Sequence, residues 1–349
     1  MVGTCRLAEP NGGVLAFVVI EWRESMEAQP VFRAGDAIAF PGMGPSPFFE
    51  SAKFMLINPV ARRMVAAADE VLGYGLVDRY RESEGDYSEA AQVAFLVNCL
   101  ALAAWAQERL GARASVCAGA SFGGKAAAVH TGSLDFADAV WMTAEMARRE
   151  DEYFACEYRE AVTHSFARTP GDRLDEILAE LTERGVWHEV SCYIDEDFFM
   201  VSLDGAEVEG LDVRLRAVGG LPLYSMRPPM HCAAFAGLRE RIEREVLAEL
   251  TFRTPEMPLI ADQDGRVVDS GEGVRRMILD GYTLPVRWPE VVSGLRGQGV
   301  GRLFMCGPDR LFGRVAVTTG NFEVVQVDPR TAMAPRPRRV PALPARSPA

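Results

Sequence analysis

The stretch AGASFGGKAA, residues 118–127, places a serine between glycines at the start of an alanine-rich run. The apolar residues before it predict a short buried strand, and the alanine-rich residues after it predict a helix. In this strand–turn–helix context a G-x-S-x-G serine stands at a sharp elbow, beside the N–H groups and positive dipole end of the helix. Ser121 is therefore a candidate nucleophile. The alternative is that Ser121 only caps the helix, as serine often does.

The composition is that of a soluble globular protein of enzyme size, and 349 residues favour a main domain that carries an inserted one. A formal net charge of -12 argues against general nucleic-acid binding, which needs a dominant basic face. The seven cysteines are scattered without a C-x-x-C pair, which indicates neither a disulfide framework nor a metal site. We expect a monomer in a reducing cytoplasm.

Both ends of the chain are expected to lie outside the fold. The apolar stretch VLAFVVI at 14–20 is too short for a membrane span and has no features of an export signal, so residues 1–33 are interpreted as an N-terminal extension. Whether residues 1–25 truly belong to the protein is left open. Residues 331–349 are rich in proline and arginine and are predicted to be disordered. No membrane partner is expected.

Between these ends the pattern predicts an α/β fold in two parts. Residues 34–151 and 227–330 alternate strands with helices, as in an α/β-hydrolase-like domain with a parallel sheet. Within the first part, residues 89–111 are apolar on all faces and predict a buried central helix that ends at a glycine. Residues 152–226 contain shorter elements in the order βαββαβ, which is the ferredoxin-like pattern of an inserted subdomain.

A serine nucleophile needs a base, and the chain has only four histidines. His130 follows the serine on the same predicted helix and points away from it, while His164 and His188 fall on predicted surface segments of the insert. An ordinary core or surface role is preferred for these three. His231 lies on a proline-bounded loop where the chain re-enters the main domain, and it is the candidate base.

At this point the chain resembles the malonyl-CoA:acyl-carrier-protein transacylases and the related acyltransferases of polyketide synthases. Four motifs carry the resemblance over about residues 34–328, in the family's order. They are AFPGMG at 39–44 for F-P-G-Q-G, GASFGG at 119–124 for G-H-S-L-G-E, MHCAAF at 230–235 for S-H-C-A-L-M, and ADQDGRVV with LPVRW for N-x-D-G and N-P-V-x-W.

The resemblance implies a role for each matching residue. Ser121 would form an acyl-enzyme ester, and His231 would act as its general base and then protonate the leaving thiol. The oxyanion would lie between the backbone N–H groups of Met43 and Phe122. A main-chain carbonyl near Gly281 would orient the histidine.

Several departures from the family fall on residues that handle substrate. The family's histidine before the nucleophile is Ala120, its first-loop glutamine is Met43, and the arginine that holds the malonyl carboxylate is Met146. Burying a carboxylate without that guanidinium is costly, so malonyl groups are expected to be poor substrates unless another arginine reaches the site. With Met230 and Pro229, these residues predict an apolar, adaptable acyl pocket. They could equally be ordinary core residues.

Arg148 and Arg149 follow closely on the same predicted helix. Two residues correspond to about 200 degrees of rotation, so Arg148 is on the wrong face to replace the missing arginine. Both arginines are interpreted as surface residues that could contact a carrier protein.

Our leading hypothesis is an acyltransferase that moves a non-malonyl acyl group through Ser121 onto the phosphopantetheine thiol of an acyl carrier protein. The donor is an acyl-CoA or an acyl-carrier protein, the pathway is polyketide, fatty-acid or other specialised metabolism, and no bound cofactor or metal is expected. Three alternatives remain open: an acyl-carrier-protein thioesterase, an ordinary malonyl transacylase, and an inactive carrier-docking module.

Overall fold

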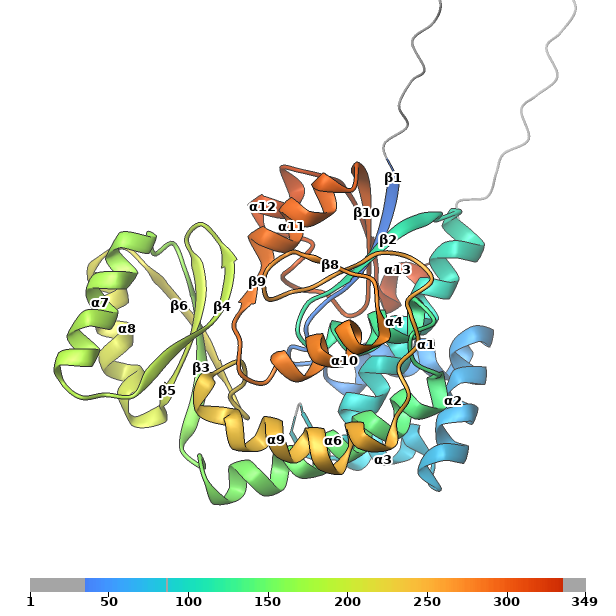
Figure 1. The fold of residues 1–349 in the computed structure, drawn as a ribbon, viewed down its shortest axis with the longest axis horizontal. Coiled ribbons are helices and arrows are strands. Elements are labelled where there is room, and N and C mark those ends of the chain that lie inside the picture. The colour runs from blue at the N-terminus through green and yellow to red at the C-terminus, as the bar shows by residue number, and fades with distance from the viewer. Residues whose placement is uncertain (1–34, 86, 335–349) are drawn as a thin grey trace, which may run out of the picture. The chain divides into compact units, whose positions relative to one another are not determined.

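The computed structural model describes residues 35–85 and 87–334, and these residues form a mixed α/β fold with two sheets (Figure 1). The expected N-terminal extension lies outside the described residues, as does all but the first part of the expected tail. That first part departs from the prediction of disorder. It belongs to helix α13 (Pro329–Met333), where Asp328 and Thr331 form a reciprocal capping box.

The main sheet has six strands, and its first five in spatial order are parallel. In spatial order they are β11 (Glu323–Val327), β10 (Val300–Cys306), β1 (Gly35–Phe40), β2 (Ala114–Gly119), β7 (Leu259–Ile260) and the antiparallel β8 (Val267–Val268). The central strand β1 is covered on both faces because its alternate residues enter two different cores. Ile38 and Phe40 enter one core, and Ala37 and Ala39 the other.

Helices cover both faces of this sheet. The helices that contribute to the Ile38 core are α1 (Phe48–Ile57), α2 (Pro59–Leu72), α3 (Leu76–Glu82), α4 (Glu89–Leu110), α5 (Gly123–His130), α6 (Phe136–Cys156), α9 (Ala236–Glu245) and α10 (Gly271–Asp280). On the other side lie α11 (Trp288–Gly297) and the short α12 (Ala316–Thr319). Trp288 is fully buried there, and its indole N–H donates to Thr318.

Helix α4 confirms the predicted central helix and ends at Gly111, which adopts the left-handed conformation expected of a C-cap. Within the described residues it is the one helix whose length and hydropathy would also suit a membrane span. Its most apolar window is 83% buried inside the protein, so it is a core helix.

The second sheet is formed by the predicted insert. Its chain order is β3 (Ala161–Ala167), α7 (Gly171–Glu183), β4 (His188–Asp195), β5 (Phe198–Asp204), α8 (Val208–Ala217) and β6 (Leu221–Met226). The spatial order β6-β3-β5-β4 and the antiparallel pairing are those of a ferredoxin-like unit. Both helices lie on the side of this sheet away from the main domain (Figure 1).

Two features differ from the sequence-based expectation. Helix α6 continues to Cys156, and β3 starts only at Ala161, so the change to short elements comes later than residue 152. The strand β9 (Val286–Arg287), from the part of the chain after the insert, pairs in parallel with β4 at the edge of the small sheet. Backbone hydrogen bonds of this kind cannot be read from a hydrophobic pattern.

Candidate active site

The nucleophile elbow is built where β2 ends and α5 begins. Ser121 adopts φ 51°, a left-handed conformation that is uncommon for a non-glycine residue. A close crossing of backbones makes the elbow possible: a Cβ on Gly119 would lie 2.3 Å from the carbonyl of Gly123. Ser121 thus precedes Phe122, the N-cap of α5, and its hydroxyl lies in a cavity, where it contacts His231.

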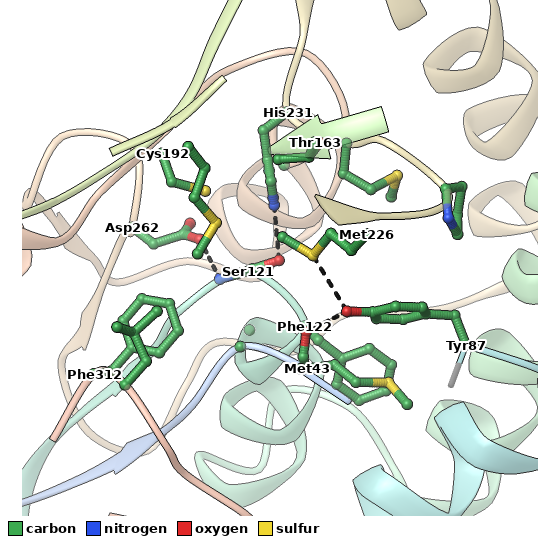
Figure 2. Close-up of a pocket in the computed structure, with 18 of the residues that line it drawn as sticks. Met43, Tyr87, Ser121, Phe122, Thr163, Cys192, Met226, His231, Asp262 and Phe312 are labelled. Atoms are coloured by element: carbon green, nitrogen blue, oxygen red, sulfur yellow. Dashed lines mark hydrogen bonds between the residues drawn. The ribbon is translucent and has the colours of Figure 1, made fainter. Parts of the chain in front are cut away.

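The candidate base reaches the nucleophile from the loop after β6. Nε2 of His231 lies 2.8 Å from Oγ of Ser121 (Figure 2), and the imidazole is only 7% exposed. Burial lowers the pKa of His231 to about 4, while the backbone carbonyls of Gly281 and Leu284 act in the opposite direction. The imidazole is therefore neutral at pH 7 and able to accept the proton of the serine hydroxyl.

Two backbone donors stand beside the serine. Met43 and Phe122 both line the cavity, on the β1–α1 loop and at the start of α5 (Figure 2). Over the described part of the chain, neither backbone N–H is donated to another protein group. Both donors are thus free to bind an oxyanion, as the resemblance implies.

Asp262, which follows strand β7, is a buried ionisable residue beside the serine. The Ser121 N–H donates to Oδ2 of Asp262 at 2.6 Å, and the aspartate is only 3% exposed. Burial raises the pKa of Asp262 to about 7, although the hydrogen bond from Ser121 acts to lower it. In the motif N-x-D-G of the family that the sequence resembles, this position is an uncharged asparagine.

Asp262→Asn is expected to stabilise the fold at alkaline pH. The unfolded carboxyl ionises near pH 4 and the folded one near pH 7, so the stability of the native protein falls as pH rises through this window. Asparagine keeps the acceptor for Ser121 without the buried charge. The gain should be up to about 4 kcal/mol at pH 8 and near zero at pH 4, measured by urea unfolding at both values.

The neighbouring Asp264→Asn serves as the control: Asp264 is exposed and its charge makes only a minor contribution to the raised pKa of Asp262, so any pH-dependent gain should be much smaller. Equal stability of Asp262→Asn and the native protein at pH 8 would show that the carboxyl is not destabilised by burial.

The cavity around the serine has a volume of about 420 Å³ and is lined mainly by apolar side chains. Met43 and Met230 both line it, as expected from the sequence. The small sheet contributes further walls, among them Met200 and Met226, so the cavity lies between the two sheets (Figure 2). Methionines at such positions adapt their shape to different apolar groups.

The structure places three of the expected pocket residues elsewhere. Ala120 is fully buried in the core on the α11 side of the sheet, and Met146 is fully buried among the helices on the other side. Pro229 is buried and does not line the cavity, whereas the preceding Pro228 does. The cause at position 146 is rotation along α6: the residue one turn later, Glu150, is the one that lines the cavity.

The other candidate residues stand apart from the serine. Arg148 and Arg149 form surface ion pairs with acidic side chains, as the helical geometry predicted. His130 ends α5 with its ring against Phe40, outside the cavity lining. His164 departs from the surface position expected for it: it is buried on β3, where it pairs with an aspartate of α8.

Sequence reasoning missed a group of polar residues inside the cavity. Lys125 and Glu150 both line it, together with Gln92 and Tyr282. Glu150 accepts hydrogen bonds from Nε2 of Gln92 at 3.1 Å and from the Tyr282 hydroxyl at 2.8 Å. One signal was available: Lys125 follows the nucleophile by four residues, which is about one helical turn. No group of His, Cys, Asp and Glu in the described ranges could hold a metal ion.

Comparisons with known proteins agree with this geometry. A family model described as the VinK acyltransferase small domain matches residues 165–226. The malonyl CoA-acyl carrier protein transacylase of Escherichia coli K12 is 27% identical over 285 residues, covering 79% of this chain and 89% of that protein. The corresponding transacylase of Bacillus subtilis strain 168 is 25% identical, covering 84% of this chain and 94% of its own.

Solved structures extend the comparison. A malonyl-transacylase in complex with its type II polyketide synthase acyl-carrier protein superposes with a TM-score of 0.75 at 25% identity, covering 84% of this chain and 96% of that one. The FabD structure from Acinetobacter baumannii, at 21% identity, gives the same TM-score and supports the fold. Over about four fifths of its length the chain is therefore similar to malonyl CoA-acyl carrier protein transacylases, which are acyltransferases.

Proposed function

We propose that this protein takes an acyl group from a thioester donor as an ester on Ser121 and transfers it to the phosphopantetheine thiol of an acyl carrier protein. The observation that carries the proposal is the 2.8 Å contact between Oγ of Ser121 and Nε2 of a neutral, buried His231 at the wall of the cavity. A serine hydroxyl is a weak nucleophile until an adjacent base accepts its proton.

The chemistry proceeds in two symmetrical halves. His231 accepts the hydroxyl proton as Oγ of Ser121 attacks the thioester carbonyl, and the N–H groups of Met43 and Phe122 bind the oxyanion. Collapse of the tetrahedral intermediate breaks the C–S bond, and the histidine returns the proton to the departing thiol. The carrier's thiol then reverses these steps and leaves with the acyl group.

The proposed substrates bring the phosphopantetheine, so the reaction uses no bound cofactor. An acyl-CoA or a loaded carrier protein serves as the donor, and a carrier protein is the acceptor. The solved complex of a related transacylase with its carrier protein supports this choice of partner. Arg148 and Arg149, exposed and partly exposed on α6, remain candidates for contact with an acidic carrier.

The proposal also concerns which acyl group is transferred. The relatives named above are malonyl transacylases, and this supports malonyl as a substrate. The expectation of a non-malonyl group rests on Met146, whose thioether cannot replace a guanidinium. Since Met146 lies in the helical core, the identity of the acyl group depends on the polar residues that do reach the cavity.

Intact-protein mass spectrometry tests the proposal. The protein is mixed with malonyl, acetyl, longer and amino-acylated CoA thioesters, with and without a holo carrier protein. We expect a covalent adduct of the mass of one acyl group that passes to the carrier when the carrier is added. Release of free acid without carrier loading would instead identify a thioesterase, and the absence of any adduct would favour a carrier-docking module.

A further inference from the structure

The cavity contains a buried ammonium group that the proposed mechanism does not use. Lys125 is one of two lysines in the chain, and it is only 9% exposed, whereas Lys53 is exposed on α1. Within the part of the chain that the structure describes, Nζ of Lys125 has neither a hydrogen-bond acceptor nor an ion-pair partner. It lies 4.6 Å from the centre of the Phe122 ring, a cation–π contact.

This arrangement leaves the ammonium group available to a substrate. An ammonium group carries three N–H donors, and those of Lys125 face the cavity rather than a protein acceptor. Burial accordingly lowers the pKa of Lys125, while the nearby charge of Glu150 acts to raise it. An acceptor delivered by the substrate would satisfy donors that the protein leaves unpaired.

Glu150 determines which kind of acceptor fits. Each of its carboxylate oxygens accepts a hydrogen bond from an uncharged donor, one from Gln92 and one from Tyr282. These two donors hold the carboxylate in place but do not neutralise its charge. Lys125 is close enough to interact electrostatically with that charge, although the two side chains form no direct ion pair. The pair is neutral in sum, whereas a site for a carboxylate needs a net positive charge.

We propose, on the basis of the function proposed above, that Lys125 donates a hydrogen bond to an uncharged oxygen acceptor of the acyl group. The acceptor is a ketone or amide carbonyl, or a hydroxyl, placed beyond the thioester carbonyl, because Lys125 lies about one helical turn from Ser121. Glu150 makes the same position unfavourable for a carboxylate. Lys125 is thus a specificity-determining residue on the cavity wall, which Met146 does not reach.

The test compares pairs of CoA thioesters of equal chain length, of which one member carries the acceptor. Acetoacetyl is compared with butyryl for the ketone, 3-hydroxybutyryl with butyryl for the hydroxyl, and 3-acetamidopropionyl with hexanoyl for the amide. Malonyl is nearly isosteric with acetoacetyl and supplies the carboxylate. The measured quantity is kcat/KM for formation of the Ser121 ester, and at least one neutral acceptor should exceed both its apolar partner and malonyl about tenfold or more.

Variants of the two charged residues separate binding from folding. For the preferred acceptor, Lys125→Met should lower the ratio of its kcat/KM to that of the apolar partner about tenfold or more, toward one. Lys125→Gln keeps an N–H donor and should retain part of this preference. Glu150→Gln should raise the malonyl-to-butyryl ratio about tenfold, because it leaves the ammonium uncompensated. Lys53→Met is the matched control, and melting temperatures verify that each variant is folded.

Other results would overturn the inference. Equal rates for acceptor-bearing and apolar groups in the native protein, with the Ser121 ester still formed, would refute the role of Lys125 and leave the proposed function intact. A preference for malonyl that Lys125→Met abolishes would show that the lysine binds a carboxylate. If neither these CoA thioesters nor the same acyl groups loaded on a carrier protein acylate Ser121, the proposed function itself fails and the inference fails with it.

Discussion

Ser121→Ala is expected to abolish the covalent acyl adduct and to lower the rate of acyl transfer about 10⁴-fold or more. The reason is geometric: Oγ of Ser121 is the hydroxyl that lies 2.8 Å from the basic nitrogen of His231. Alanine removes the nucleophile but leaves the cavity and the backbone donors in place. The measurements are intact mass after incubation with a thioester, and the rate of carrier loading.

Cys192 provides the control for this experiment, because a second nucleophile lines the same cavity. A thiol reacts as its thiolate, and burial raises the pKa of Cys192 well above its ordinary value, so the thiol stays protonated at neutral pH. Cys192→Ala should therefore retain the adduct that Ser121→Ala loses. Turnover that persists in folded Ser121→Ala would exclude the proposed mechanism, and loss of the adduct in Cys192→Ala alone would point to the cysteine.

Much of the fold could be predicted from the hydrophobic pattern and the turn residues of short sequence segments. The elbow at Ser121 could be predicted because a buried strand, two flanking glycines and an alanine-rich helix follow each other within a few residues. The inserted subdomain could be predicted because each of its elements is short and bounded by turn residues. The end of α6 could not: Tyr153 and Phe154 are apolar aromatic residues that suit a strand, yet they lie on the helix and pack in the core.

The walls of the cavity were harder to predict, because they are formed by residues far apart in the sequence. The family alignment identified position 146, but whether a side chain reaches the cavity depends on how α6 is rotated against its neighbours. Glu150 could not be recognised as a cavity residue from the sequence, because Gln92, Tyr282 and Lys125, which line the same cavity, lie on separate elements. The catalytic pair was predictable for a different reason: few histidines were available, and one lay at the point of re-entry.

Substitution of Gly123, two residues after the nucleophile, is expected to cause a large loss of stability. Gly123→Ala would place a Cβ 2.3 Å from the carbonyl oxygen of Phe40 and 2.9 Å from that of Pro41. These are backbone atoms at the end of β1, a central strand with neighbours on both sides, so they cannot move without disturbing the sheet. We expect a loss of about 3 kcal/mol or more in the free energy of unfolding, measured by chemical denaturation.

The adjacent glycine offers the same substitution without the clash. A Cβ on Gly124 would meet only the terminal methyl of Met277, at 3.6 Å, which is ordinary van der Waals contact. Alanine is also the better helix former at this position of α5, so Gly124→Ala should leave stability unchanged or raise it by up to about 1 kcal/mol. Similar losses in both variants would mean that the cost arises from α5 itself. A loss confined to Gly123→Ala would show that the close crossing of α5 over β1, which holds Ser121 in its elbow, is what the motif's second glycine maintains.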